Sequence, residues 1–531
     1  MTVQSFVGPF APELLLLAGA LLVFLLDVLK VRRNEVVGGV AVVASVAALA
    51  FVVADLGFGP LAFLATIPAS SVDRLPAVGT APLYAFSSLG LVFQAIFLLA
   101  AFFVALASTS RPSDERGAPI FFGLLLLATL GMLLVAIASD LIFLLLAIEV
   151  VSIASYLLVA YTRKDIRGLE AAMKFFIIGA LSTVLSFFGA SLLFGAYGTT
   201  NLYLIRAAGT AVAYPTLVLL GYGFLIAGLA FKVTLVPFHA WAVDVYDGAP
   251  DDVSAFLAGG TKKIGVFAFF LVFLGPVLVV GTAGQSGYGL FGGSVALGAS
   301  FQVALGLLAV VTMTVGNVLA LLQKEMKRML AYSSISQAGY MLIGIAIGSA
   351  PALGGATLQV FAHVLMKTGA FLVVGAVAAL GVGPLIEDWR GIGLKRPLLA
   401  TSFALMLLSL AGVPLTIGFV SKFVLFSAAV QAQGWFIWLA VAGLLNSALS
   451  VFYYARVLMV MFFDVAPADP IPAGAVVGAS GPPALPVGGL GYGRAATLAV
   501  IAVLIVALGI YPQVVLGPIQ TAAYHFVSVG A

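Results

Sequence analysis

The sequence predicts an all-α, polytopic integral membrane protein with about fourteen transmembrane helices. Of its 531 residues, 63% are hydrophobic and only 8% are charged, which excludes a soluble globular protein. Apolar runs recur along the chain, and many approach the roughly 20 residues that a helix needs to cross the hydrocarbon core. They centre near residues 20, 48, 95, 128, 150, 184, 227, 266, 308, 338, 367, 412, 447 and 505.

The first apolar run, which begins at Pro12, is interpreted as a retained helix. It is too long for a signal peptide and lacks a basic start and a small-residue cleavage site. With the N-terminus outside, sixteen of the 24 Lys and Arg residues fall in cytoplasmic loops, two fall outside and six lie within spans. Because cytoplasmic loops carry an excess of basic residues, this orientation is the predicted one. Nothing resembles an organelle address, so we expect the cytoplasmic membrane of a bacterium.

The order of the spans predicts an internal repeat. Five helices that begin inside are followed by five that begin outside, so the two units would be inverted copies. Pro237 and Pro414 fall in the fourth helix of each unit. A proline breaks helical hydrogen bonding, and paired broken helices in inverted repeats indicate a transport site. The predicted divisions are an N-terminal three-helix segment, two five-helix repeats, and a cytoplasmic linker with a C-terminal helix: 1–118, 119–282, 283–464 and 465–531.

The composition also limits the chemistry. The chain has no cysteine and only three histidines, too few for iron–sulfur, haem or zinc sites. It shows neither a GxGxxG nor a GxxxxGK[ST] stretch for a nucleotide, and we expect no nucleic-acid partner. We therefore expect no cofactor and no metal in this chain, and any redox group would sit on a partner.

Glu149 and Lys232 are the first candidate functional residues. Glu149 lies near mid-bilayer, where a charged side chain costs roughly 2.5 to 3.5 kcal/mol and normally faces the interior, a partner charge or water. As partners, the two could act as a proton switch, because moving them apart would release the lysine's proton. The alternatives are a protonated Glu149 bonded to Ser152 or Ser155, and a Lys232 that is an inert ion-pair member.

Further candidates lie on the later helices. Lys262 lies at similar depth to Glu149, and we prefer it over the adjacent Lys263, since residues about 100° apart cannot both face one path. Lys422, which follows the Pro414 break, is a candidate terminal proton carrier. His239 beside Pro237 suits a relay, although a lone histidine is as often a packing residue.

Two other sites remain open from the sequence. Lys174 is about two turns from a helix end, so snorkelling to the interface and function are equally good interpretations. His363 and Lys367 lie four residues apart on one helix face, where they extend a polar path or pair with a neighbour.

Several motifs resemble a known family. The stretches FKVTLVPFHAWAVDVYDGAP, EMKRMLAYSSISQAGYMLIG, SLAGVPLTIGFVSKF, EAAMKFFIIGA and NSALSVFYYARV are similar to the antiporter-like membrane subunits of respiratory complex I, the proton-pumping NADH:quinone oxidoreductase. The resemblance covers about residues 119–464. VDVYDGAP and Lys422 resemble subunit N most closely, whereas HVLMKTGAF is more polar than usual there and resembles subunit M or the multisubunit sodium/proton antiporters.

The resemblance implies roles for the candidates. Glu149 and Lys232 would be a coupled pair, His239 would bridge towards Lys262, and Lys422 would serve the exit half-channel. Lys174 would have a smaller effect. NADH, FMN, iron–sulfur clusters and quinone would belong to partner subunits of a hetero-oligomer in the lipid bilayer.

The sequence thus favours a proton-translocating subunit of a complex-I-like enzyme. A sodium/proton antiporter subunit without a redox arm is the first alternative. A secondary carrier for an organic solute is the second, although a line of lysines fits a proton wire better than a roomy pocket. A scaffold that pumps nothing is the third.

Overall fold

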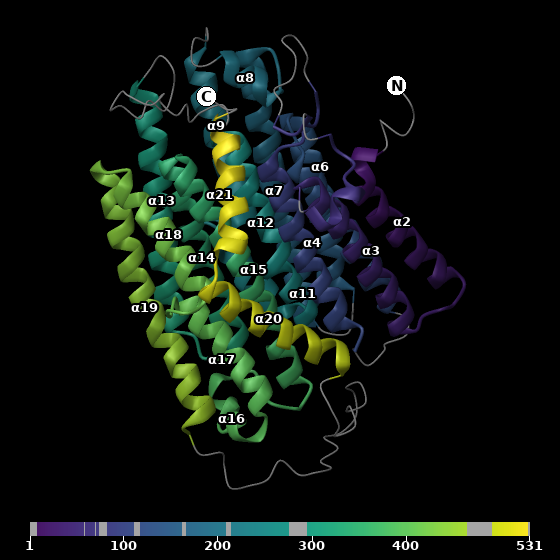
Figure 1. The fold of residues 1–531 in the computed structure, drawn as a ribbon. Helices are drawn as coiled ribbons and strands as arrows, with labels where there is room; N and C mark the ends of the chain where they lie inside the picture. Colours follow the sequence, from purple (N-terminus) through teal and green to yellow (C-terminus); the bar gives the residue numbers. More distant parts are fainter. Residues whose placement is uncertain are drawn as a thin grey trace.

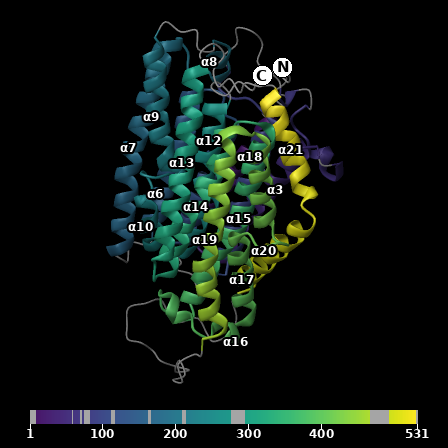
Figure 2. The same cartoon turned by 90° about the vertical axis from the view of Figure 1, so that its left-hand side faces the viewer.

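The computed structural model of the chain is a bundle of helices, with no strand among the residues it describes. These residues are 8–57, 59–68, 71–73, 82–110, 117–161, 166–208, 214–274, 295–464 and 491–528. Most helices run along the long axis of the bundle, and the start of α2 and the end of α21 lie at the same end (Figures 1 and 2).

The first half of the chain contains these helices: α2 (Ala11–Val28), α3 (Asn34–Asp55), α4 (Ser88–Ser108), α5 (Ala118–Ala136), α6 (Leu141–Ala160), α7 (Ile166–Tyr197), α8 (Leu202–Ala208), α9 (Pro215–Val233), α10 (Ala240–Gly248), α11 (Asp251–Phe256) and α12 (Lys262–Phe269). Two π-helical turns, Leu257–Thr261 and Phe270–Leu274, flank α12. Short 3₁₀ turns occupy Gly8–Phe10 and Gly59–Leu64.

The second half contains these helices: α13 (Val295–Leu321), α14 (Met326–Ile347), α15 (Ala350–Ala378), α16 (Ile392–Lys395), α17 (Pro397–Ala411), α18 (Ile417–Gln431), α19 (Ile437–Phe462), α20 (Tyr492–Ile510) and α21 (Gln513–Ser528). Short 3₁₀ turns occupy Ile386–Trp389 and Gly434–Phe436.

The helical membrane architecture is confirmed. Thirteen helical segments within the described residues are long and apolar enough to span a membrane. Two shorter apolar helices, α17 and α18, flank Pro414. Counted together as one interrupted helix, they bring the number to the predicted fourteen. All but one of the predicted centres fall inside a helix, and the exception, residue 412, falls in this interruption.

The C-terminal region differs from the single helix that was predicted. α20 runs obliquely across the lower part of the bundle, and α21 then turns along the long axis (Figure 1). Pro512 lies between them, where its missing amide donor ends the regular helix. α21 packs against α15 and α4, so the end of the chain closes one side of the bundle. The predicted linker before α20 lies almost wholly outside the described residues.

α15 forms the centre of the bundle. The apolar 18-residue stretch of α15 is completely buried, whereas only a third of the corresponding stretch of α7 is buried. α15 contacts α14, α17, α18, α20 and α21 as well as α4 and α11. The outer face of α7 presents Met173, Phe176 and Ile177 to the surroundings, as expected for a lipid-facing helix. Polar residues on α15 are therefore far from lipid and face other helices.

Candidate functional site

The first predicted helix break lies between α9 and α10. Thr234 ends α9 in the left-handed conformation, with φ of 66°. Freed backbone groups find side-chain partners here: the Val236 amide donates to Thr312 Oγ1 at 3.2 Å, and Trp241 Nε1 donates to the Phe231 carbonyl at 3.2 Å. Because hydrocarbon offers no hydrogen bonds, such partners are what allow a break at this depth. The break places Lys232, which is partly buried, in the last turn of α9.

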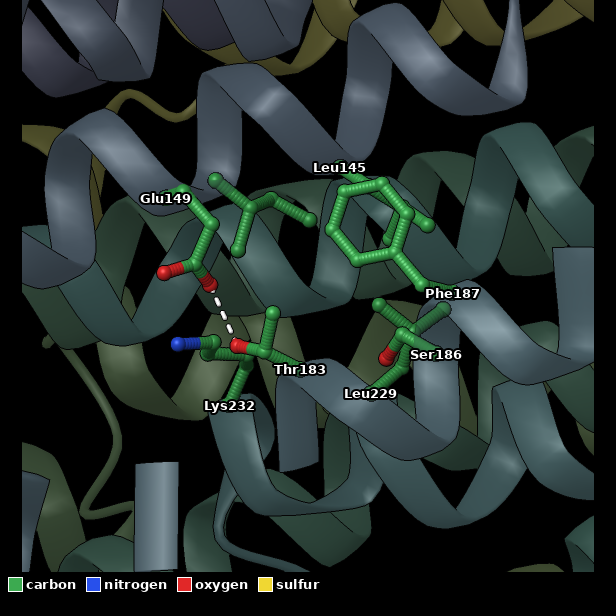
Figure 3. A pocket seen from close by; sticks show the side chains of 8 residues that line it. Leu145, Glu149, Thr183, Ser186, Phe187, Leu229 and Lys232 are labelled. Carbon is green, nitrogen blue, oxygen red and sulfur yellow. Dashed lines mark hydrogen bonds between the residues drawn. The ribbon is translucent and has the colours of Figure 1, made fainter. Parts of the chain in front are cut away.

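Glu149 and Lys232 line one small pocket between α6, α7 and α9. Figure 3 shows both side chains reaching it from their separate helices. Its free volume of about 10 Å³ is roughly enough for one water molecule. Lys232 Nζ donates to Ser152 Oγ at 2.6 Å, and Thr183 Oγ1 donates to the Glu149 carboxylate. The two charged groups share the pocket, but no ion pair joins them within 4 Å. Each is instead bound by a hydroxyl group, Lys232 by Ser152 and Glu149 by Thr183.

The neighbouring lysines of α12 point in different directions. Lys262 reaches across to α14, where Nζ donates to the Ser334 carbonyl at 2.8 Å and to Ser334 Oγ at 3.3 Å. Lys263 turns back, and its Nζ donates to the Ala258 carbonyl at 2.9 Å within the preceding π-helical turn. A π-helical turn changes the hydrogen-bonding register of the backbone, which gives Lys263 a local acceptor. This geometry favours Lys262 for a path between helices, and that role stays a prediction.

α9 packs closely on α12 beside Lys232. A Cβ atom on Gly265 would lie 3.0 Å from Lys232 Cβ and 2.6 Å from Val233 Cγ2. Gly265 is three residues after Lys262, so the glycine lets the helix that carries one lysine approach the other. His239, between α9 and α10, interacts electrostatically with Lys262, and its Nδ1 is buried without a hydrogen-bond partner. The bridging role expected for His239 stays a prediction.

The second predicted break separates α17 from α18 and holds Lys422. Gly412 ends α17 with φ of 90°, and Thr416 caps the start of α18. Lys422 Nζ donates to the carbonyls of Leu410 and Ala411 at 2.8 and 3.1 Å, and to Ser447 Oγ at 2.9 Å. Carbonyls at the C-terminal end of a helix carry partial negative charge and attract a cation. Lys422 therefore sits where the broken helix offers neutral acceptors.

His363 and Lys367 lie fully buried on α15. Lys367 Nζ donates to the Leu330 carbonyl at 2.7 Å and to Ser333 Oγ, both on α14. Both ring nitrogens of His363 lack a hydrogen-bond partner, and the ring interacts electrostatically with Lys262, Lys263 and Lys367. These residues extend the polar interior from Lys262 along α14 and α15.

Lys174 lies apart from this interior row. Its side chain is 43% exposed and forms ion pairs with Glu170 at 2.8 Å and Asp244 at 2.9 Å. Arg328 also reaches Asp244, at 3.2 Å. The structure thus places Lys174 in a surface network, as in the snorkelling interpretation.

The interior lysines share a chemical feature. Lys232, Lys262, Lys263, Lys367 and Lys422 all donate to hydroxyl or carbonyl oxygens, and none forms an ion pair with a described carboxylate. A nearby carboxylate favours the charged form of a lysine, whereas neutral oxygens do so less. Such lysines can exchange protons without first breaking a strong ion pair.

Sequence reasoning missed the polar neutral residues that hold these charges. Thr183 and Ser334 are examples. Two buried glutamines were missed as well, Gln337 and Gln359, which bond to each other and not to a charged group. Their types do not titrate, so a search for charged residues passes over them. Glutamine within an otherwise apolar span was the available signal, because an unpaired amide is costly there.

Comparisons with known proteins point in one direction. The family model for the transmembrane region of NADH:quinone oxidoreductase/Mrp antiporter proteins matches residues 138–450. "F(420)H(2) dehydrogenase subunit N" of Methanosarcina mazei is 39% identical over 463 residues, covering 85% of this chain and 88% of that protein. "NADH-quinone oxidoreductase subunit N" of Trichlorobacter lovleyi is 41% identical over 377 residues, covering 70% and 73%.

Solved structures share the fold. A chain of respiratory complex I from Thermus thermophilus aligns with a TM-score of 0.71 at 30% identity, covering 95% of this chain and 98% of that one. A chain of the Mrp complex from Dietzia sp. aligns with a TM-score of 0.80 at 21% identity, covering 100% of both chains. At that identity the second likeness concerns the fold alone.

Proposed function

The chain belongs to the NADH:quinone oxidoreductase/Mrp antiporter transmembrane family, and from this premise we propose that it is a proton-translocating membrane subunit of a complex-I-like oxidoreductase. It would work in a hetero-oligomer of membrane subunits in the bacterial cytoplasmic membrane, with its N-terminus outside. Redox chemistry would take place in partners that hold NADH or another donor, FMN, iron–sulfur clusters and quinone. This chain would move protons in response.

One observation carries the proposal. Lys232, Lys262 and Lys422 lie within the bundle, and each ammonium group donates to neutral oxygens. Two of them lie at breaks where the backbone itself supplies polar groups. An amine held this way keeps its hydrogen-bond partners nearby when its charge changes, which suits repeated protonation.

The proposed path begins at the Glu149 pocket. A proton would pass between Glu149 and Lys232 through the hydroxyl groups and the single water that the pocket can hold. It would continue to Lys262 past His239, and then along α14 and α15 to Lys422. Energy from quinone reduction would act by shifting charge along this row. Protonation changes of a few pKa units, at about 1.4 kcal/mol each, have the right size for such coupling.

The test uses the native assembly. We would purify it, identify its other chains, and measure proton uptake in sealed vesicles carrying Lys232→Ala. The proposal predicts redox partner subunits and a loss of pumping, while Lys395→Ala at the exposed surface leaves pumping unchanged. Normal pumping by Lys232→Ala would contradict it.

A sodium/proton antiporter subunit is the second candidate, because the matching family includes Mrp antiporters as well as NADH:quinone oxidoreductases. It predicts sodium-dependent proton exchange in vesicles without any electron donor. Co-purification with redox subunits and donor-driven pumping without sodium would exclude it.

A further inference from the structure

A directed chain of hydrogen bonds runs through the interior beside Lys422. Ser421 Oγ donates to Gln359 Oε1 at 2.5 Å, and Gln359 Nε2 donates to Gln337 Oε1 at 2.6 Å. Gln337 Nε2 then donates to the Leu410 carbonyl at 3.3 Å. The three side chains come from α18, α15 and α14, and each is completely buried. Every amide in the chain accepts on one side and donates on the other.

This chain meets the proposed terminal carrier at one atom. The Leu410 carbonyl also accepts from Lys422 Nζ, at the shorter distance of 2.8 Å. A carbonyl oxygen has two lone pairs, so it can hold both donors. Leu410 lies in the last turn of α17, where no helical amide satisfies its carbonyl. Lys422 and Gln337 therefore share the same buried acceptor.

We propose that Gln337, oriented by Gln359 and Ser421, is a positioning residue that keeps the Leu410 carbonyl bonded when Lys422 gives up its proton. The inference rests on the proposed function of Lys422. A neutral amine is a weaker donor than an ammonium group and would leave the carbonyl more easily. With Gln337 in place, that departure leaves no unpaired carbonyl in a site without bulk water.

Gln337 also lies close along α14 to the contacts of Lys367. Gln337 lies one helical turn after Ser333, which accepts from Lys367. Tyr454 of α19 lies near both Ser333 and Gln337, and its buried hydroxyl has no aligned hydrogen bond. Gln337 is thus placed between the middle of the row and its end.

Two substitutions at position 337 test the proposal in the purified native complex, reconstituted in sealed vesicles. Gln337→Leu removes the second donor, so proton translocation should slow by about 5- to 150-fold, the factor that corresponds to one unpaired buried carbonyl. Gln337→Glu can donate only when protonated. Its translocation should approach that of the parent at acidic pH and fall as the pH rises. Gln302→Leu, a buried glutamine on α13, is the matched control and should behave like the parent.

The pH readout has a defined set of titratable neighbours. α14 itself carries Tyr340, one turn after Gln337. The elements packed against α14 carry the other titratable or charged groups: Tyr453, Tyr454 and Arg456 on α19, Lys422 on α18, His363 and Lys367 on α15, Lys262 and Lys263 on α12, and Asp244, Tyr246 and Asp247 on α10. α13 and α17 contribute none within Val295–Leu321 and Pro397–Ala411. The parent and Gln302→Leu retain all of these titratable groups. A pH dependence of translocation seen only with Gln337→Glu therefore comes from the new carboxyl group.

The outcomes separate the inference from the proposed function. If Lys422→Met blocks translocation while Gln337→Leu matches the parent, the inference is overturned and the role of Lys422 stands. If Lys422→Met also matches the parent, the role of Lys422 fails. Equal impairment of Gln337→Leu and Gln337→Glu at every pH would show a structural role and overturn the inference. If Gln337→Leu does not assemble, the pH dependence of Gln337→Glu decides alone.

Discussion

Replacing Lys422 by Met and by Arg separates a proton carrier from a structural cation. Methionine has similar length but no donor. Arginine keeps the charge and the donors. The account predicts that both variants lose proton translocation, whereas a structural role predicts a loss with Met alone.

The magnitudes follow from the contacts of Lys422. Met leaves the Leu410 and Ala411 carbonyls without the ammonium group, but Leu410 keeps Gln337 and Ala411 keeps the Ser447 hydroxyl at 3.1 Å. Because a fully unpaired buried group costs about 1–3 kcal/mol, we expect a loss near the lower end, about 1 kcal/mol per carbonyl, and a folded chain. The ordinary pKa of arginine is about 2–3 units above that of lysine, so proton release should slow by about 10²- to 10³-fold.

The assay is quenching of a pH-sensitive dye in vesicles that contain the native complex, driven by its electron donor and quinone. Electron transfer is recorded in parallel, and an uncoupler defines the baseline. We expect fewer protons per electron for both variants. An Arg variant that pumps like the parent would refute proton transfer through this residue and leave only a charge requirement.

Three further predictions follow from single contacts. Lys174→Ala should change pumping by no more than about twofold in the same assay, because the exposed ion pairs of Lys174 are screened by solvent. A loss of about tenfold would show that Lys174 takes part in proton transfer. Gly265→Leu should slow pumping at least about tenfold although no charge is removed, because the new side chain separates α12 from Lys232, and Gly265→Ala should be milder. Asp140→Ala removes the N-cap of α6, because the Asp140 carboxylate accepts from two backbone amides in the first turn. The substitution should lower the free energy of unfolding by about 1 kcal/mol, measured as a lower midpoint of thermal inactivation. An unchanged midpoint would argue against the cap.

The spans and the two breaks could be predicted from local sequence. Apolar length sets where a helix can cross, and Pro237 and Pro414 remove backbone donors wherever they stand. Both breaks were found at the expected places. The turn between α20 and α21 was missed. α21 has 16 residues, fewer than the roughly 20 of a span, so the sequence predicted only one C-terminal helix.

The partners of the charges could not be predicted in the same way. Spacing alone makes Lys262 and Lys263 equivalent apart from their rotation about the helix, and the π-helical turn that separates their directions leaves no reliable sequence signal. The expected pair of Glu149 with Lys232 was found in one pocket, but Ser152 and Thr183 hold the charges there. Which hydroxyl meets which charge depends on helix rotation, which only the packed structure fixes.

The most direct test of proton movement along the buried lysines is the number of protons translocated per electron in the native complex carrying Lys262→Met. Lys263→Met, measured beside it, shows the effect of placing a methionine in the same helix turn. The account predicts a clear fall in the ratio for Lys262→Met and a smaller change for Lys263→Met. A ratio for Lys262→Met equal to that of the parent would contradict it.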